Sequence, residues 1–378
     1  MRLTFKQIKD EISKIVPRDI EYSVELEAGN IAIVSPEPLK FGGGDGLVGK
    51  IAKKVKRKIK IRPDKSIMKS EIDTKSMVES IIPEEADVTQ IYFDACFCEV
   101  IIQCKNPGEA VGKRGANVQK IREETGWIPI VERTPPIFSK TVHDIRGYRN
   151  ANAEERRKLL KDFGLNMHRP TRPGQSWARV TALGSYREVG RACHFVTTNE
   201  SRVMIDVGVN IASVTDPMPF FTAPEAMPLE KLDAVVLTHS HLDHAGMLPV
   251  LFKYGYRGPV YCTPPTRDLM LLLQSDYIKV SGAEGRSPPY DMEDIRTCMK
   301  HVVDVNWGET TDISPDIKLT FSNAGHILGS SAVHLHIGEG KHNIVFSGDQ
   351  KYEKSWLFDA ANTRFPKVET LVIESTYG

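Results

Sequence analysis

Short apolar runs recur along the second half of the chain, and each ends in polar residues. Runs at 202–205, 234–237, 317–321, 343–346 and 370–373 have the length of buried strands. Acids, histidines or glycines follow at or just beyond the end of each run. Because separate strands can end at one edge of a sheet, we expect these distant side chains to converge on a single site.

The first half alternates shorter helical and strand patterns. Residues 1–16 predict an amphipathic helix, and 20–35 predict two paired strands. A glycine loop at 41–46 leads into a cationic helix at 47–59. A charge run is often only a solvated helix face, although glycine backbone beside it favours contact with phosphate. The candidate phosphate contacts on this helix are Lys53, Lys54 and Arg57.

A second glycine loop lies between an apolar run at 88–104 and a helical pattern at 116–126. It consists of Gly112, Lys113, Arg114 and Gly115. The glycines let the backbone approach a single strand closely, while the cations and the helix N-terminus attract phosphate. Alternatively, the two glycines serve only a structural turn that requires left-handed backbone. In this setting the segment resembles the KH domain, which binds single-stranded nucleic acid.

We therefore expect a KH domain at 71–145 and a KH-like domain at 1–70. The glycine loop of the latter is degenerate, because Asp45 stands where a cation would be expected. Residues 146–178, which include a charged helical pattern, are predicted to form a linker.

Charge is unevenly distributed along the chain. Residues 1–178 contain 32 lysines and arginines against 25 acids, whereas residues 179–378 contain 18 against 24. This asymmetry suggests that one part holds a polyanion and the other reacts with it. Cys96 and Cys98 lie in a strand-like run and are expected to be small packed side chains. No Cys-x-x-Cys pair, membrane span or signal core is evident, so we expect a cytoplasmic protein without membrane partners.

The strongest chemical signal is the segment 238–246. In extended backbone His239 and His241 point the same way, so both imidazoles can reach one ion. As the chain turns, Asp243 and His244 swing toward a neighbouring position, where a second ion could bind. So many polar side chains at a buried corner need partners, which argues against a solvated histidine-rich loop.

The pattern His-x-His-x-Asp-His after an apolar strand resembles the signature of the metallo-β-lactamase superfamily of dinuclear zinc hydrolases. Together with Asp206, His326, Asp349 and Glu374, the motif order is similar to that of the β-CASP nucleases. With KH domains in front, the chain resembles archaeal homologues of the cleavage and polyadenylation specificity factor endonuclease. That family is linked to RNA 3′-end formation and transcription termination.

The resemblance implies an α+β multidomain fold. Two KH-like α/β modules would precede a metallo-β-lactamase αββα sandwich at 179–378, which ends where the family inserts its β-CASP cap. The chain has no counterpart of the histidines that follow the cap in the family, and one of these completes the second metal site. If Gly378 is the natural end, we expect the second zinc site to be incomplete and Glu374 to lack its histidine partner; if the chain is a fragment, the activity belongs to the intact protein.

Ligand roles are carried over from the family by motif. One Zn²⁺ would be held by His239, His241, His326 and Asp349. The other would be held by Asp243, His244 and the bridging Asp349. Asp206 would orient the site, and the residues expected to serve catalysis are Asp206, Asp243, His244 and Glu374.

The implied function is a zinc-dependent ribonuclease that cuts single-stranded RNA as an endonuclease, with 5′–3′ exonuclease activity as a further option. RNA polymerase is a candidate partner, and a homodimer is expected for full-length family members. Two alternatives stay open: a non-catalytic RNA-binding fragment, and a hydrolase of small thioesters or lactams. The basic KH half and the Glu-Ser-Thr-Tyr-Gly segment argue against a small substrate.

Several other residues are ambiguous. Tyr186 and Arg187 either line the cleft or belong to a turn beside the first hairpin. His334 and His336 have strand spacing and match no family ligand, so an ordinary strand face is expected for them.

Overall fold

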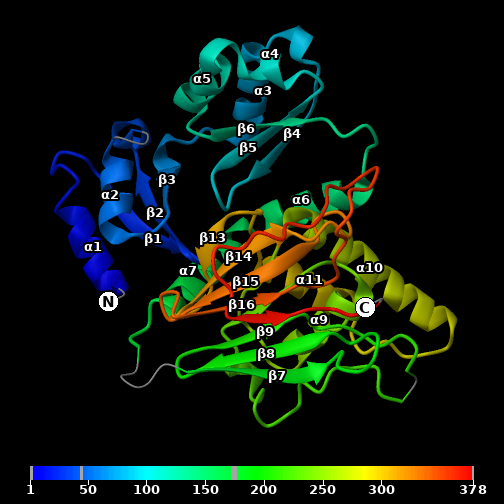
Figure 1. The fold of residues 1–378 in the computed structure, drawn as a ribbon. Coiled ribbons are helices and arrows are strands. Elements are labelled where there is room, and N and C mark those ends of the chain that lie inside the picture. Colours follow the sequence, from blue (N-terminus) through cyan, green and yellow to red (C-terminus); the bar gives the residue numbers. More distant parts are fainter. Residues whose placement is uncertain (1–2, 43–45, 172–176, 214, 377–378) are drawn as a thin grey trace. The chain divides into compact units, whose positions relative to one another are not determined.

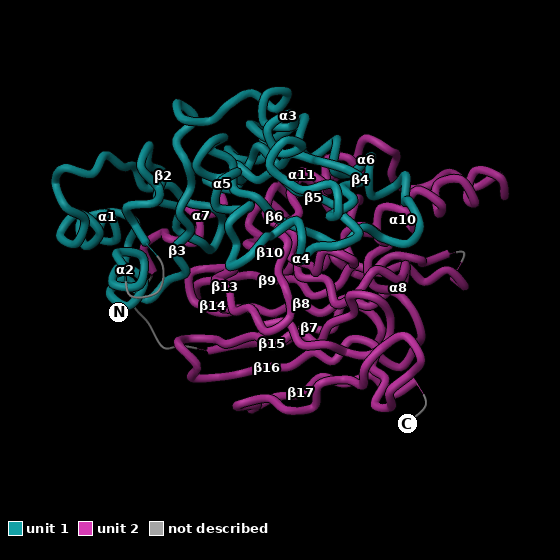
Figure 2. The backbone as a smooth tube through the Cα atoms, turned by 90° about the horizontal axis from the view of Figure 1, so that it is seen from above, with its two compact units in different colours: residues 1–162 teal, residues 163–378 magenta. Residues whose placement is uncertain are grey.

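The structure is a computed structural model that describes residues 3–42, 46–171, 177–213 and 215–376. It divides into two compact units, Met1–Asp162 and Phe163–Gly378, which Figure 2 shows in different colours. The degenerate glycine loop expected around Asp45 lies outside the described residues. No helix in the described ranges is both long and apolar enough to cross a membrane.

The first module of unit 1 is a three-stranded sheet with helices packed on it. The central strand, β2, pairs antiparallel with β1 and parallel with β3. Ile8 and Ile12 of the first helix lie in its apolar core together with Phe41. Its elements are α1 (Phe5–Ser13), β1 (Ser23–Glu27), β2 (Asn30–Ser35), the 3-10 helix η1 (Pro38–Phe41), α2 (Leu47–Val55), β3 (Ile59–Pro63) and η2 (Lys65–Ile67).

The second module repeats this topology. Strand β5 is central, antiparallel to β4 and parallel to β6, and the helices cover one face of the sheet (Figure 1). Because both modules share one element order and one pairing scheme, residues 1–70 have the architecture expected of a KH-like module. The elements are α3 (Glu71–Ile81), η3 (Glu84–Ala86), β4 (Val88–Asp94), β5 (Glu99–Cys104), α4 (Pro107–Val111), η4 (Lys113–Gly115), α5 (Ala116–Thr125) and β6 (Ile128–Arg133).

The strand-like run expected to contain Cys96 and Cys98 is in fact a hairpin, so that prediction is wrong. The chain turns between β4 and β5, where Cys98 has a φ of 57°. The Asp94 carboxylate accepts the N–H of Cys96 at 3.1 Å and stabilises the turn. Both cysteine side chains are buried, as expected, with 3% exposure each.

An arginine joins the two modules of unit 1. The Arg62 guanidinium donates to Glu27 of its own module at 2.8 Å and to Glu99 of the second module at 2.9 Å. It also lies over the ring of Phe97, with 5.0 Å between the guanidinium carbon and the ring centroid. Arg62 is 7% exposed, so these ion pairs are shielded from water.

The segment predicted as a linker contains helical structure. Helices α6 (Lys140–Ala151) and α7 (Ala153–Met167) follow the second module, and the boundary between the two units falls inside α7. Arg156 of α7 is 1% exposed and pairs with Asp94 at 3.2 Å. The proposed domain boundaries at 70, 145 and 178 stay predictions.

Unit 2 contains two sheets. The six-stranded sheet has the order β12-β11-β10-β9-β8-β7; strands β9 to β12 are parallel, and β7 to β9 pair antiparallel. Its strands are β7 (Ala178–Gly184), β8 (Cys193–Thr198), β9 (Arg202–Ile205), β10 (Ala234–Val236), β11 (Val260–Cys262) and β12 (Val302–Asp304).

The five-stranded sheet has the order β13-β14-β15-β16-β17 and is antiparallel except for the β16–β17 pair. It faces the first sheet (Figure 1), and Phe346 of β16 packs against His194 of β8, with ring centroids 5.2 Å apart. Its strands are β13 (Thr310–Asp312), β14 (Ile317–Asn323), β15 (Ser331–Ile337), β16 (His342–Phe346) and β17 (Thr370–Val372). Two facing sheets agree with the predicted sandwich.

The helices of unit 2 lie in the connections between parallel strands. Such crossovers place helices on the face of a parallel sheet. Helix α11 also packs against both α9 and α10. In chain order the helices are η5 (Leu229–Lys231), α8 (Leu242–Ala245), α9 (Leu248–Lys253), α10 (Pro264–Ala283) and α11 (Met292–His301).

Candidate metal centre

Asp206 anchors the edge of the sheet from which the site is built. Strands β9 and β10 are parallel neighbours, so Asp206 and Thr238 follow them at the same edge. The Asp206 carboxylate accepts the Thr238 N–H at 2.7 Å and the Thr238 hydroxyl at 2.8 Å. Asp206 is 1% exposed and has a φ of 60°, a backbone conformation that aspartate tolerates better than most residues.

Backbone hydrogen bonds hold the histidine-rich segment in place. The N–H of Val207 donates to the carbonyl of His244 at 2.7 Å, and the N–H of Ala192 donates to the carbonyl of Asp243 at 2.8 Å. A Cβ on Gly208 would lie 1.6 Å from the same Asp243 carbonyl oxygen. Only glycine permits this close approach.

The first donor group combines three imidazoles and one carboxylate: His239, His241, His326 and Asp349. Nδ1 of His241 lies 3.2 Å from Nε2 of His239 and 3.2 Å from Nε2 of His326. The Asp349 carboxylate is 3.5 Å from the His326 nitrogen and 3.8 Å from the His239 nitrogen. Tetrahedral zinc with bonds of about 2.0–2.1 Å places neighbouring ligand atoms about 3.3 Å apart. The donor chemistry and the spacing therefore fit a divalent ion.

Two histidines of the first group, His239 and His241, are in the protonation state that metal binding requires. Burial lowers the pKa of His239 well below its usual range, and the neighbouring histidines His244, His241 and His326 add to the effect. Burial and His326 lower the pKa of His241 as well. Both imidazoles are therefore neutral near pH 7, with lone pairs available to a metal.

The second donor group consists of Asp243, His244 and Asp349. Nε2 of His244 lies 3.1 Å from Oδ1 of Asp349 and 3.8 Å from Oδ2 of Asp243. The other ring nitrogen, Nδ1, is 2.8 Å from Asp206, which favours a proton there and a lone pair at Nε2. Asp349 faces the first group with Oδ2 and this group with Oδ1, as a bridging carboxylate would.

The carboxylates around His244 favour its charged form, with a proton on each ring nitrogen. Burial opposes its charge, but Asp206 and Asp349 outweigh burial and raise the pKa of His244 well above its usual range. An ion at Nε2 has to displace that proton, so binding to this group should weaken as pH falls.

Thr238 supports both groups, a role that the sequence did not reveal. Its hydroxyl lies 3.0 Å from Nδ1 of His239 and 3.3 Å from Nδ1 of His244. It also donates to Asp206. Its place directly before the first histidine of the motif, at the end of a buried run, is the only sequence signal for this role.

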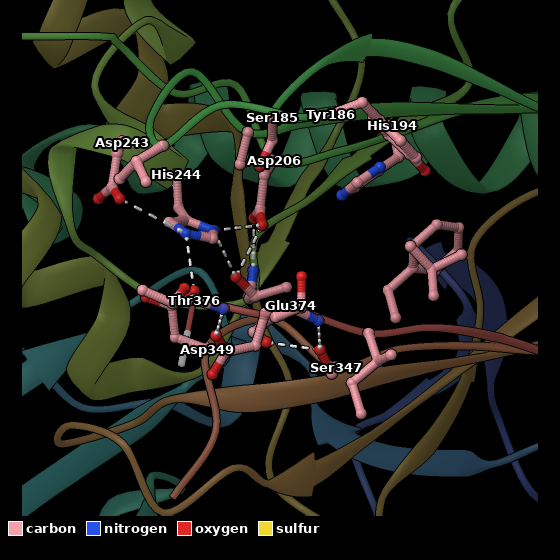
Figure 3. A pocket seen from close by; sticks show the side chains of 18 of the residues that line it. Ser185, Tyr186, His194, Asp206, Asp243, His244, Ser347, Asp349, Glu374 and Thr376 are labelled. Atoms are coloured by element: carbon pink, nitrogen blue, oxygen red, sulfur yellow. Dashed lines mark hydrogen bonds and ion pairs between the residues drawn. The ribbon is translucent and has the colours of Figure 1, made fainter. Parts of the chain in front are cut away.

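A cavity of about 530 Å³ opens beside the second donor group. In Figure 3, Asp206, Asp243 and His244 lie on one wall, and Asp349 and Glu374 lie on the wall opposite. The two Glu374 oxygens accept backbone N–H groups of Gln350 and Thr376, both at 3.2 Å. Glu374 thus lines the cavity without joining either donor group.

The glycine loop of the second KH-like module has the expected form. Gly112 and Gly115 have φ values of 74° and 79°, and Lys113 and Arg114 between them are exposed. A Cβ on Gly112 would approach the Asn117 side chain to 2.8 Å, so glycine is required there. Both cations are available to a ligand.

The three predicted contacts in the first module have different surroundings. Lys53 is exposed on α2. Lys54 pairs with Glu11 at 3.3 Å, and Arg57 donates to the carbonyl of Lys56 at 3.0 Å. RNA binding by Lys54 or Arg57 would therefore compete with contacts inside the module.

Comparison with known proteins identifies the two parts of the chain. A model of the metallo-β-lactamase superfamily domain matches residues 195–373, and a model of the KH domain of transcription termination factor FttA matches residues 2–68. The KH model thus covers the module whose glycine loop is degenerate.

Close relatives cover nearly the whole chain. Transcription termination factor FttA of Methanosarcina mazei is 47% identical over 372 residues, which is 98% of this chain and 58% of that protein. The FttA of Methanothermobacter thermautotrophicus is 45% identical over 99% of this chain and 59% of its own length. The FttA of a Lokiarchaeum is 41% identical over 100% of this chain and 59% of its own length. The chain therefore spans less than two thirds of the length of these relatives.

The fold and these matches agree with the KH and metallo-β-lactamase domains that the sequence predicted. We conclude that this chain joins a KH domain to a domain of the metallo-β-lactamase superfamily and is a homologue of the archaeal transcription termination factors FttA.

Proposed function

We propose that this chain carries the metal centre of a zinc-dependent ribonuclease that cleaves single-stranded RNA in 3′-end processing and transcription termination. The observation that carries the proposal is the pair of donor groups that share Asp349 and open on one cavity. The name of the relatives, transcription termination factor, supports RNA as the substrate and RNA polymerase as a partner.

The chain's own residues would hold and orient the reacting groups. When bound in such a pair, zinc ions lower the pKa of water and stabilise the charge that develops on a phosphodiester. Asp206 fixes the ring of His244 through Nδ1. Asp243 lines the cavity, where it can accept the proton of the attacking water. Exonuclease action from a 5′ end would use the same groups on a different RNA segment.

RNA capture is assigned to the basic half of the chain. The exposed Lys113 and Arg114 lie between glycines at the N-terminal end of α5, a geometry that suits the phosphates of a single strand. The loop would deliver RNA without contributing to the chemistry.

A second candidate function is RNA binding without turnover. It is favoured by one observation, that the second donor group contains three donors among the described residues. Three protein ligands can also form a catalytic zinc site with an open position, so only measurement separates the two functions.

The test is zinc content per chain combined with cleavage of end-labelled single-stranded RNA. Asp243→Ala with His244→Ala should lower the zinc content and abolish cleavage. Asp144→Ala with His143→Ala is the matched control, because these residues form an adjacent acid–histidine pair outside the site. About two zincs per wild-type chain, with cleavage lost only in the first variant, supports the nuclease. RNA that is bound but uncut at every zinc concentration selects the second function.

A further inference from the structure

The loop at 185–191 forms one rim of the cavity and holds a strained backbone. Ser185, Arg187 and Arg191 have φ values of 69°, 62° and 44°, and Gly190 has 98°. A positive φ costs free energy in residues with a side chain, and it persists only where the surroundings hold the backbone in place. Three such residues in one short segment point to a loop built for a particular shape.

Two side chains brace this loop from within. The Glu188 carboxylate accepts the N–H of Ser185 at 3.2 Å and the Nε–H of Arg191 at 2.7 Å. Arg191 also reaches the Asp216 carboxylate at 2.5 Å. Glu188 and Arg191 therefore act within the protein and fix the backbone on which the remaining residues are presented.

Arg187 lines the cavity and has no partner in the part of the chain that the structure describes. Among the described residues that line the cavity, it is the only lysine or arginine, and it makes no hydrogen bond or ion pair. Its side chain is exposed. A guanidinium is a planar donor that matches phosphate oxygens, and the braced loop holds the backbone that carries it.

Tyr186 offers an aromatic surface next to this cation. Its ring meets the edge of His194, with centroids 5.5 Å apart, and His194 packs on Phe346. Figure 3 shows Tyr186 and His194 together on the rim. The Tyr186 side chain is held on its inner side and remains 49% exposed, so a base can stack on it.

We propose that Tyr186 and Arg187 form a nucleotide subsite on this rim. Tyr186 stacks on the base beside the scissile bond, and Arg187 binds the phosphate of that nucleotide. Stacking requires an unpaired base, so the subsite selects single-stranded RNA over duplex. This inference rests on the proposed ribonuclease function, to which it adds a means of choosing the substrate.

The experiment uses the whole chain and a short single-stranded RNA that carries 4-thiouridine for crosslinking. Arg187→Gln and Tyr186→Ala should each raise KM about tenfold, as expected for one charged hydrogen bond or one stacked base, and change kcat less than about threefold. Tyr186→Phe keeps the aromatic ring, so its KM should equal that of the wild type. Arg286→Gln removes an exposed arginine outside the cavity and is the matched control. Crosslinked wild-type chain should carry the RNA on the peptide that contains Tyr186.

The two readouts separate this inference from the proposed function. If the wild type crosslinks at Tyr186 but cuts no RNA, the subsite stands and the nuclease proposal fails. If the wild type cuts RNA while Arg187→Gln and Tyr186→Ala behave like Arg286→Gln, the subsite is wrong and the nuclease proposal stands. If the wild type neither crosslinks to RNA nor cuts it, both the subsite and the nuclease proposal are overturned. Equal zinc content and melting temperature among the variants exclude misfolding as the cause.

Discussion

Asp206 belongs to neither donor group, yet it contacts His244, which does, and Thr238, which supports both groups. Its carboxylate holds the backbone and hydroxyl of Thr238 and the ring of His244. A group that binds the non-coordinating ring nitrogen of a metal-ligating histidine strongly affects the affinity for the metal.

Asp206→Asn keeps the size of the side chain and removes its charge. We expect zinc affinity to fall about 10- to 100-fold, because the His244 ring is no longer held in one tautomer. Competition with a chelator measures this affinity. Asp276→Asn, in an exposed position on α10, is the control. Equal affinities in the two variants would contradict the role given to Asp206.

His334 has the strand-face position that the sequence predicted, but it is only 2% exposed. Its ring packs against His336, with centroids 4.0 Å apart. Burial, with a smaller contribution from His336, lowers the pKa of His334 to about 4. The unfolded chain, with a pKa of about 6.5, binds this proton more readily.

This shift predicts acid sensitivity of unit 2. Between pH 6.5 and 4 the unfolded state binds more protons at His334, so the contribution to stability is full above pH 6.5 and is lost as pH falls toward 4. At pH 5 the contribution of His334 lowers the free energy of unfolding by about 2 kcal/mol relative to pH 7. His334→Leu should reduce the drop in unfolding free energy between pH 7 and pH 5, whereas exposed His143→Leu should leave it unchanged. The same drop in both variants would refute this assignment.

At the scale of elements, strand β3 is joined to the β4–β5 hairpin by an arginine with buried contacts. Arg62 satisfies carboxylates of both modules, and its removal leaves Glu27 and Glu99 without their cation. A buried charge without a partner is costly, whereas an exposed ion pair contributes little.

We therefore compare Arg62→Met with Lys65→Met. The first should lower the unfolding free energy of unit 1 by about 3–5 kcal/mol. The second breaks an exposed pair with Glu154 and should cost no more than about 1 kcal/mol. Urea denaturation followed by circular dichroism measures both. Similar losses in the two variants would show that burial of Arg62 adds nothing to the ion pair.

At the scale of the whole molecule, a basic half carries the glycine loop and an acidic half carries the metal donors. If the basic half binds RNA and the acidic half carries out the chemistry, substitutions in the basic half should change RNA binding without changing metal binding.

Lys113→Ala with Arg114→Ala should weaken binding of single-stranded RNA and leave the zinc content unchanged. The slope of log affinity against log salt should fall by about 0.7 for each phosphate contact that is lost. Fluorescence anisotropy at several salt concentrations measures the slope. Lys120→Ala, on the helix α5 that follows the loop, is the control, because this lysine already pairs with Glu124. A loss of zinc in the double variant would contradict the division.

The sequence by itself determined much of this protein. Spacing of two within an extended segment brought His239 and His241 together, and apolar runs identified the strands that precede Asp206, His326 and Asp349. These features are local, so a single sequence reveals them. The α+β architecture and the KH and metallo-β-lactamase domains are confirmed.

Tertiary structure decided what depends on distant contacts. The hairpin at Cys98 was missed because alternation continues through its turn. Thr238 supports both donor groups only because β9 lies beside β10. Arg187 faces the cavity because Glu188 and Arg191 pair with each other and with neighbours. Contacts between residues far apart in sequence produce no periodic pattern along the chain. These roles can therefore be recognised only from the packing of the folded chain.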